Sequence, residues 1–375
     1  MIIIKAVGII CEYNPFHNGH IHHLNEIKKQ FEGYTIILVM SGNFMQRGEI
    51  SILNKWDKTE IALNHGVDLV IELPFIFSTQ SADIFGYGAI EILNYLNVEY
   101  IVFGSETNNI SVLQNIVKTQ KEEKYNILVK YYLDKGYNYP TSMSKALTKY
   151  GYNHIDSPND LLGISYIKAI DKLNSNIIPI SIKRTNNYHK LDNSNITSAS
   201  SIRKLIEEKK DISNYVPYET LNKISPIDNH YFELLKYKIL TCNDLSIYQT
   251  VDEGLNTRIK KYVIESKNLD ELISKIKTKR YTYNKISRAL THILCSFTKA
   301  EASIYQTNEY IRILGFNKNG RKYLSKIKKD IQIPIITKYK DTKSKILDIE
   351  IKVGHIYNCI INKDINEYKK SVIIK

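Results

Sequence analysis

The sequence predicts an α/β fold in which a doubly wound parallel sheet is followed by a mostly helical, basic C-terminal domain. Three observations predict it. Short, almost entirely apolar segments recur in the first half, segments with helical periodicity lie between them, and positive charge concentrates in the second half. Continuous apolar runs are typical of parallel strands buried on both faces, and their alternation with helices indicates right-handed crossovers in an open sheet.

Strand and helix segments alternate in order along the first half. The expected strands cover residues 2–10, 34–40, 68–73, 99–103 and 176–182, with Lys5 as the interruption of the first. The expected helices cover residues 20–31, 55–64, 80–96 and 160–173. In the last of these, the apolar residues Leu161, Ile164 and Ile167 recur at the spacing of one buried helix face. The topology that follows is a Rossmann-like sheet with helices on both faces.

In such a sheet the ligand binds beyond the carboxyl ends of the strands. The loops to search are therefore residues 11–20, 41–48, 104–107 and 183–201. After about residue 211 the alternation stops and helical patterns with basic faces continue to about residue 329, so we expect two domains. The first, 1–212, is the catalytic domain and the second, 213–375, is mainly α-helical and basic. Segments 331–337 and 347–361 carry many β-branched residues and are interpreted as short strands.

The charge of the chain points to a polyanionic partner. The formal charge is +13, and between Lys275 and Asp330 the chain carries 14 Lys and Arg against three Asp and Glu. A composition rich in Lys, Ile, Asn and Tyr also arises in a biased genome, so the position of the charge is more informative than its total. We expect nucleic acid to bind the C-terminal part.

The four cysteines indicate a reduced protein. Cys11, Cys242, Cys295 and Cys359 lie far apart and lack the paired spacing of a zinc or redox motif. We therefore expect a cytoplasmic location and no dedicated metal site. The apolar first eleven residues are too short to span a bilayer, so no membrane partner is expected. The sequence leaves the oligomeric state open.

The strongest chemical signal follows the first strand, where the segment EYNPFHNGH places His17, Gly19 and His20 at a helix start. Gly19 permits close backbone approach, and the helix start offers unpaired N–H groups and a positive dipole end to an anion. Two imidazoles three residues apart can both donate to phosphate oxygens, where charge builds up during adenylyl transfer. An H-x-x-H spacing also arises by chance or as half of a metal site, but its position favours a nucleotide. His22 and His23 are interpreted as residues of the helix face.

A second phosphate-binding signal is the segment TSASSIR at residues 197–203. Small hydroxyl residues that open a helix cap it and can bond phosphate, and Arg203 follows one turn further in. Alone, the segment is an ordinary N-cap. Together with the histidine turn it predicts two helix N-termini that converge on one polyphosphate.

The two motifs resemble those of the HIGH-type adenylyltransferases, which carry an H-x-G-H turn early and an I-S-S-x-x-I-R-like motif late. Here Ala199 stands where a hydroxyl is common. One family is resembled in particular, the bacterial tRNA(Met) cytidine acetate ligases. The resemblance rests on VGIICEYNPFHNGH, VMSGNFMQRGE, KWDKTEIALNHGVDLVIELPF, STQSADIFGYGAI, VFGSE and SPNDLLGISYIKA, and later on KRYTYNKISRALTHIL and YIRILGFNKNGRKYL. It covers nearly the whole chain.

The resemblance implies a two-step reaction. ATP activates acetate as acetyl-adenylate, and the acetyl group then moves to N4 of the wobble cytidine of elongator tRNA(Met), giving N4-acetylcytidine. ATP is then a substrate, and Mg²⁺ is expected to accompany it. His17 and His20 are the expected catalytic residues. The expected ATP-binding residues are Ile10, Asn14, Gly19, His23, Gly104, Asn159, Arg184, Ser198, Ser200 and Arg203.

Other residues near the strand ends allow two interpretations. Residues 41–47 lie near the small carboxylate or the target base, with Arg47 pairing an anion, or they form a structural turn. Asp68 and Glu72 flank the third strand and are interpreted as structural in preference to a catalytic base. Lys55 and Lys58 open a helix; they could reach the γ-phosphate, but we expect them on a solvated face.

Basic and aromatic residues alternate in the C-terminal part. Arg280, Tyr281, Tyr283, Lys285 and Arg288 suit phosphate binding and stacking on unpaired bases, although Tyr also packs between helices. A second basic group comprises Arg312, Lys318, Arg321, Lys322, Lys326, Lys328 and Lys329. We expect tRNA to be bound by Arg280, Lys285, Arg288, Arg321 and Lys322.

Two rival functions stay open at this point. A metabolite adenylyltransferase would explain the motifs but would leave the basic C-terminal half without a purpose. A non-catalytic RNA-binding factor with a degenerate nucleotide fold would explain the basic half, but it has no need of both imidazoles of His17 and His20.

Overall fold

The structure is a computed structural model that describes residues 5–153, 155, 157–184, 196–225, 227, 229–252 and 254–375. Within this part of the chain, eight strands form one sheet in the order β5-β4-β1-β2-β3-β6-β7, with β8 paired to β6. The strands are β1 (Ala6–Cys11), β2 (Thr35–Ser41), β3 (Leu69–Leu73), β4 (Tyr100–Ser105), β5 (Ile178–Lys183), β6 (Ile311–Phe316), β7 (Ile335–Ile336) and β8 (Ile373–Ile374).

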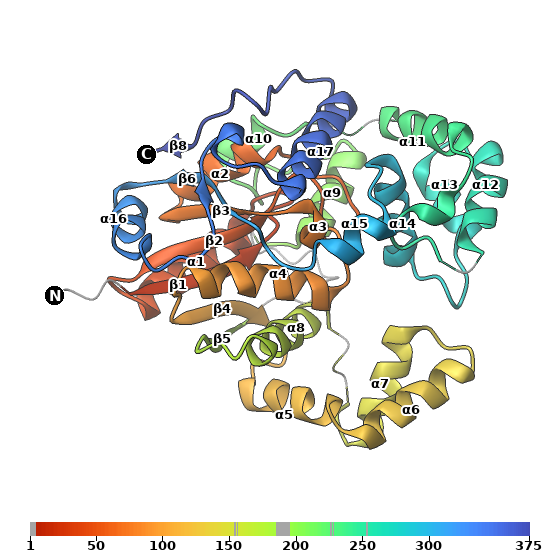
Figure 1. The fold of residues 1–375 in the computed structure, drawn as a ribbon, viewed down its shortest axis with the longest axis horizontal. Helices are drawn as coiled ribbons and strands as arrows, with labels where there is room; N and C mark the ends of the chain where they lie inside the picture. Colours follow the sequence, from red (N-terminus) through yellow and green to blue (C-terminus); the bar gives the residue numbers. More distant parts are fainter. Residues whose placement is uncertain are drawn as a thin grey trace.

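Helices surround this sheet. They are α1 (Asn18–Gln30), α2 (Lys55–Asn64), α3 (Phe75–Ser78), α4 (Ala82–Tyr95), α5 (Ile110–Gln120), α6 (Glu123–Asp134), α7 (Tyr139–Lys149), α8 (Pro158–Lys172), α9 (Ala199–Glu207), α10 (Tyr218–Leu221), α11 (His230–Thr241), α12 (Leu255–Glu265), α13 (Leu269–Ile276), α14 (Tyr283–Leu294), α15 (Lys299–Ile304), α16 (Lys318–Ile327) and α17 (Lys345–Ile361), with 3-10 turns η1 (Leu245–Ile247) and η2 (Tyr339–Asp341). Figure 1 shows α11 to α14 grouped beyond one end of the sheet and α5 to α7 below it. None of the described helices is both long and apolar enough to cross a bilayer.

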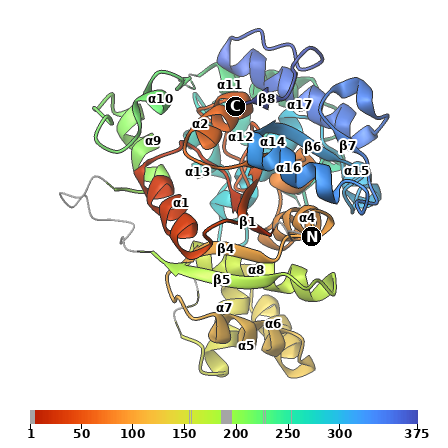
Figure 2. The ribbon, with the colours of Figure 1, turned by 90° about the vertical axis from the view of Figure 1, so that its left-hand side faces the viewer.

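The predicted doubly wound sheet is confirmed. β1 pairs in parallel with β2 on one side and with β4 on the other, and β3 and β5 extend the sheet outward in parallel. The chain therefore changes direction across the sheet between β1 and β4, which is where such sheets bind ligands. Helices cover both faces: Val7 and Ile9 pack with Leu24 of α1, whereas Ala6 and Ile10 pack in the second core. Figure 2 shows α1 and α4 on different sides of β1.

The C-terminal part adds strands to the same sheet, which the sequence interpretation missed. β6 pairs antiparallel with β3, and the short β7 and β8 pair in parallel with β6. The expectation of helices alone up to residue 329 is therefore wrong at β6. The division into 1–212 and 213–375 stays a prediction, and the sheet draws strands from both sides of it.

The expected strand at 347–361 is wrong, because this segment forms the helix α17. Its buried residues include Ile346, Ile349, Val353, Tyr357 and Ile360, which recur three or four positions apart. β-branched residues disfavour a helix only weakly, and burial of most of a helix surface outweighs that preference. In the expected strand at 331–337, only Ile335–Ile336 pair as β7.

Candidate active site

A cavity of about 1140 Å³ opens at the carboxyl ends of β1, β4 and β5. Its wall combines these strand ends and the start of α1 with α7, α9 and α14. Nine basic residues line it against three acidic ones. The basic residues are Arg47, Lys145, Lys168, Lys183, Arg184, Arg203, Arg280, Lys285 and Arg288, and the acidic ones are Glu12, Glu49 and Asp83. This imbalance favours a polyanionic ligand.

The two histidines of the HNGH turn are positioned by the helix start itself. His17 is the N-cap of α1, and its Nδ1 accepts a hydrogen bond from the Gly19 N–H at 3.0 Å. The backbone N–H of His17 donates in turn to Nδ1 of His20 at 3.2 Å, and the two ring centroids lie 3.8 Å apart. Because Nδ1 is an acceptor in both neutral rings, the proton of each ring is assigned to Nε2. Both residues therefore offer an Nε2–H donor at the cavity.

Burial keeps these rings neutral. It lowers the pKa of His17 to about 3, with a further contribution from Arg184. It also lowers the pKa of His20 well below its ordinary value, assisted by His17 and His23. Gly19 is required because a Cβ there would lie 2.7 Å from the His17 ring. The turn thus supplies two neutral donors and no general base at neutral pH.

His23 is more than a residue of the helix face. It lines the cavity, and its buried Nε2 has no hydrogen-bond partner among the described residues. Burial lowers its pKa to about 4, with a contribution from Arg184. An unpaired buried ring nitrogen is unfavourable unless a ligand or water pairs with it. His23 therefore faces the cavity, and its role in ATP binding stays a prediction.

The ends of β4 and β5 form a second wall. The Arg184 side chain lies over Gly104, where a Cβ would come within 3.2 Å of its Cγ. Asn159 donates through Nδ2 to Glu106 at 2.5 Å. Between them the carboxylate of Asp160 accepts from the hydroxyls of Ser105, Thr107 and Ser157. Asp160 thereby fixes the loop after β4 against the start of α8.

Asp160 was not among the expected site residues, although it belongs to the SPND motif. Burial acts against its ionised form, yet the hydrogen bonds from Ser105, Thr107 and Ser157 hold its pKa below the ordinary value. Its carboxylate is fully engaged by the protein. We therefore assign Asp160 a positioning role for the neighbouring Gly104 and Asn159.

The second motif lies on the same cavity. Ser198 caps α9 by accepting from the Ser201 N–H at 3.1 Å, and Ser200 lines the cavity beside it. Arg203 donates to the backbone oxygen of Asn14 at 2.7 Å and to Glu49 at 2.6 Å. The starts of α1 and α9 thus lie on one cavity, as the two motifs predicted. Residues 185–195, in the preceding loop, lie outside the described residues.

Asn14 and Ile10 shape the wall from β1. The side-chain amide of Asn14 donates to the Ile50 oxygen at 3.2 Å, and its oxygen accepts from the Ile52 N–H at 2.9 Å. These bonds tie the histidine turn to the loop after β2. Both Asn14 and Ile10 line the cavity, where Asn14 is already bonded to the protein.

The expected tRNA-binding residues fall into two places. Arg280, Lys285 and Arg288 line the cavity. Arg321 and Lys322 do not, because α16 packs at the amino ends of the strands. There Gly320 touches the backbone of Asp68, which precedes β3, and α16 appears at the far left of Figure 1.

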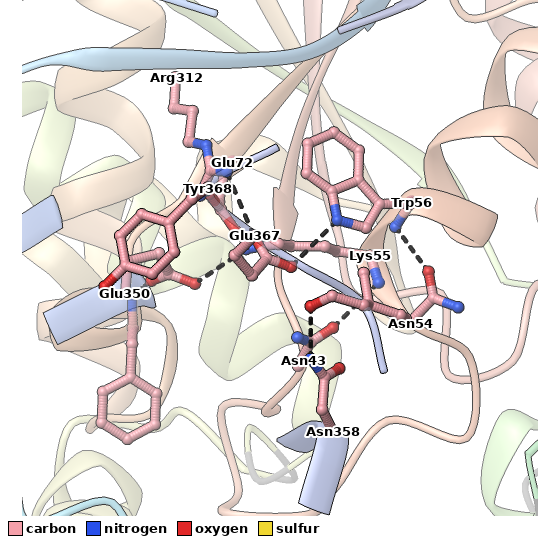
Figure 3. Close-up of polar contacts among 12 residues, drawn as sticks. Asn43, Asn54, Lys55, Trp56, Glu72, Arg312, Glu350, Asn358, Glu367 and Tyr368 are labelled. Carbon is pink, nitrogen blue, oxygen red and sulfur yellow. Dashed lines mark hydrogen bonds and ion pairs between the residues drawn. The ribbon is translucent and has the colours of Figure 1, made fainter. Parts of the chain in front are cut away.

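A buried charge cluster lies elsewhere, formed by Lys55, Glu72, Arg312, Glu350 and Glu367 (Figure 3). Lys55 Nζ lies 2.7 Å from Glu72, 3.0 Å from Glu367 and 3.6 Å from Glu350. Arg312 pairs with Glu72 at 2.9 Å and with Glu367 at 3.3 Å. All five side chains are buried.

This charge cluster corrects two expectations and agrees with a third. Lys55 is not on a solvated face, and Arg312 does not belong to an exposed basic group. Glu72 is a structural ion-pair partner, as interpreted. Burial, with Glu72 beside it, raises the pKa of Glu350 to about 8, whereas Lys55 and Arg312 hold the pKa of Glu72 down at about 2. The Glu72–Glu350 pair therefore retains one proton at neutral pH, which leaves two cations facing two carboxylates.

Lys58 and Asp68 are also structural. Lys58 is buried and donates to the backbone oxygens of Glu12, Ser41 and Gly42 at 2.6 to 3.0 Å, so its expected place on a solvated face is wrong. Burial lowers its pKa to about 7. Asp68 accepts from the Ile36 N–H at 2.8 Å and from Asn317 at 2.8 Å.

No group of three or more His, Cys, Asp or Glu among the described residues is arranged to hold a metal ion. The three acidic residues of the cavity are engaged by the protein. Glu12 accepts from the Gln46 N–H at 2.6 Å, Glu49 pairs with Arg203, and Asp83 pairs with Lys168 at 3.4 Å.

Comparison with known proteins identifies the family. The family model described as HIGH Nucleotidyl Transferase matches residues 4–371. A tRNA(Met) cytidine acetate ligase of Geobacillus sp. is 40% identical over 380 residues, covering 95% of both chains. The enzyme of that name from Clostridium acetobutylicum is 40% identical over 402 residues, covering 99% of this chain and 100% of the relative.

Solved structures agree with the sequence comparison. The crystal structure of Thermotoga maritima TmcAL bound with alpha-thio ATP matches with a TM-score of 0.89 at 30% identity, covering 99% of both chains. The apo form of the same protein matches with a TM-score of 0.90. This chain therefore belongs to the tRNA(Met) cytidine acetate ligase family of the HIGH nucleotidyltransferases.

Proposed function

We propose that this protein uses ATP to activate acetate and transfers the acetyl group to N4 of the wobble cytidine of elongator tRNA(Met). One observation carries the proposal: the histidine turn, the Ser198–Arg203 motif and the basic start of α14 line a single cavity. The phosphate-binding motifs and the RNA-binding residues can then serve one reaction centre. Relatives of 40% identity over nearly the full length carry this activity in their names.

In the first step, ATP lies over the ends of β4 and β5, with its phosphates at the starts of α1 and α9. A carboxylate oxygen of acetate forms a bond to the α-phosphorus, the bond to the α–β bridging oxygen breaks, and pyrophosphate leaves. The Nε2–H groups of His17 and His20 donate to phosphate oxygens, where negative charge increases in the transition state. The similar structure from Thermotoga maritima is bound with alpha-thio ATP, which supports ATP as the nucleotide.

In the second step, N4 of the cytidine attacks the acetyl carbonyl carbon. The bond between that carbon and the phosphate oxygen breaks, AMP leaves, and N4 loses one proton to solvent. The base must leave the stack to reach the cavity, as other enzymes that act on bases require. Arg280 is exposed and Lys285 partly exposed near the start of α14, where they can contact the RNA backbone.

Mg²⁺ accompanies ATP in this proposal as an ion held by the phosphates, where it supplies neutralising charge. The cavity acids are already bonded to protein groups, which suits an ion brought by the nucleotide better than a resident one. We place the reaction in the cytoplasm, which supplies ATP, acetate and tRNA.

The test uses purified protein, ATP, radiolabelled acetate and tRNA(Met). We expect label in the tRNA, and pyrophosphate release that depends on acetate. His20→Ala should reduce the rates of both signals by about 100-fold or more. Failure of the wild-type protein to label tRNA(Met) would contradict the function, and labelling by His20→Ala at the wild-type rate would contradict the site.

A further inference from the structure

The cavity has two sides, separated by β1. Gly104, Asn159 and Arg184 lie on the side of β4 and β5. On the β2 side lies the loop of residues 43–51, which contributes Gln46, Arg47 and Glu49 to the wall. Because the proposed nucleotide contacts occupy the first side, the second side is available to the second substrate.

This loop is rigidly built. Phe44 and Ile50 form an antiparallel bridge, and the Met45 N–H donates to the Glu49 oxygen at 2.8 Å. The turn passes through Gly48, whose φ of +84° favours glycine. Arg47 lies within this turn, in which the Gly48 N–H donates to the Met45 oxygen at 2.9 Å. The loop therefore holds the backbone of Arg47 in a defined place.

The loop tip packs directly on α14. Thr291 donates its hydroxyl to the Gly48 oxygen at 2.6 Å, and a Cβ at Gly48 would lie 2.5 Å from the Arg288 backbone nitrogen. No side chain larger than hydrogen fits between the two segments. Arg47 and Arg288 therefore stand on adjoining backbone segments, and both side chains line the cavity.

These two arginines differ from the neighbouring cations in their side-chain partners. Arg203 is paired with Glu49, and Lys285 lies 3.5 Å from Asp252. Neither Arg47 nor Arg288 makes a side-chain hydrogen bond or an ion pair with any residue that the structure describes. The charge of Arg47 acts electrostatically on the carboxylate of Glu12, but that carboxylate already accepts a hydrogen bond from the Gln46 N–H. Burial, with Arg47 nearby, lowers the pKa of Arg288 to about 10, so it stays charged at neutral pH.

We propose that Arg47 and Arg288 form a carboxylate-binding subsite that holds acetate on the β2 side of the cavity. The inference rests on the proposed function and deepens it. A carboxylate must approach a triphosphate of like charge, and two guanidinium groups on its far side offset that repulsion. One acetate oxygen bonds the arginines while the other forms the bond to the α-phosphorus and pyrophosphate leaves. Guanidinium groups suit this task because they bind carboxylates through paired N–H donors.

An RNA phosphate is the alternative occupant, and the position of Arg288 within α14 argues against it. Arg280 precedes the helix and is exposed, whereas Arg288 lies more than one turn inside it and is mostly covered. An RNA backbone is expected to contact exposed cations such as Arg280 first. A small anion such as acetate can reach Arg47 and Arg288 inside the cavity.

The test compares Arg47→Met, Arg288→Met and Arg288→Lys in acetate-dependent exchange of pyrophosphate into ATP, without RNA and with saturating tRNA(Met). Because charged hydrogen bonds to a ligand are strong, we expect the KM for acetate to rise by about tenfold or more in each Met variant. The KM for acetate should rise less in Arg288→Lys than in Arg288→Met. The KM for ATP should stay near the wild-type value in all three variants. Lys369→Met, which removes one exposed charge elsewhere, is the control.

Chemical rescue separates binding from a structural role. Added methylguanidinium should lower the KM for acetate of Arg288→Ala and leave its thermal unfolding midpoint unchanged. If the KM for acetate is unchanged in the Met variants, the acetate subsite is wrong but the proposed function still stands. The same conclusion follows if only the KM for tRNA rises. Absence of exchange in the wild-type protein under both conditions would overturn the proposed function and the inference with it.

Discussion

The cavity and the buried charge cluster are both polar, but charge is balanced in the cluster and unbalanced in the cavity. In the charge cluster each cation lies within 3.6 Å of a carboxylate, and the surroundings exclude water. In the cavity, nine basic residues face three acidic ones. A closed set of ion pairs holds elements together, whereas an excess of one sign of charge in a cavity prepares it for a ligand.

The charge cluster links segments that are distant in the sequence. Lys55 begins α2, Glu72 lies in β3, Arg312 in β6 and Glu350 in α17. Trp56 Nε1 adds a hydrogen bond to Glu367 at 3.0 Å. A buried ion pair contributes little net stability compared with apolar packing, but removal of one partner leaves an uncompensated charge. Loss of any one member of the cluster should therefore weaken the attachment of the C-terminal part to the sheet.

The largest expected effect comes from breaking this cluster. Lys55→Met should lower the free energy of unfolding by about 3–5 kcal/mol, because Glu72 and Glu367 lose a buried counter-charge. Urea unfolding followed by circular dichroism measures it, with Lys369→Met as the control. A loss below about 1 kcal/mol, the range of exposed ion pairs, would show that the cluster does not hold the fold.

The converse is expected in the cavity, where function should suffer more than stability. His20→Ala should reduce the rate of acetyl transfer by about 100- to 1,000-fold, the usual cost of losing one transition-state donor. Both histidines also belong to the cap of α1, because His17 Nδ1 accepts from the Gly19 N–H and His20 Nδ1 accepts from the His17 N–H. His17→Ala and His20→Ala should therefore each lower the free energy of unfolding by only about 1 kcal/mol. A loss of several kcal/mol in His20→Ala would argue against a mainly functional role.

The proton retained in the charge cluster gives a pH dependence. Glu350 has a pKa of about 8 in the folded protein, above its ordinary value of 4.5. A raised folded pKa means that its stabilising contribution is fully present below about pH 4.5 and is lost as the pH rises through 8. The free energy of unfolding, measured by urea titration from pH 5 to 8, should fall more steeply in the wild-type protein than in Glu350→Gln, by at most about 1.4 kcal/mol per pH unit. Parallel curves would contradict the shared proton.

The smallest effects are expected from single RNA-contacting cations. Arg280→Gln and Lys285→Gln should each weaken tRNA(Met) binding a few-fold and make the salt dependence shallower by about 0.7 to 0.9 per charge removed. Arg321→Gln on α16 is the informative comparison, because α16 lies at the other edge of the sheet. Filter binding at several salt concentrations measures all three. A larger loss in Arg321→Gln would place the RNA on the amino edge of the sheet.

Local patterns were sufficient for the five parallel strands and for the motifs. Buried runs marked these strands because parallel strands are covered on both faces, and the HNGH turn predicted a phosphate site at the start of α1 because a helix start attracts anions in any fold. The family followed from the same segments and is confirmed by the comparisons. Helix α17 was mistaken for a strand because its β-branched composition is a weak local preference that burial overrides.

The sequence by itself thus determined the five parallel strands β1 to β5 and the family to which the chain belongs, and it predicted a phosphate site at the start of α1. Only the tertiary structure decided that Lys55 and Arg312 are buried in ion pairs while Arg47 and Arg288 face a cavity. All four residues carry the same charge. Their roles depend on partners such as Glu72, which lies 240 positions from Arg312, and no local pattern records a contact at that separation.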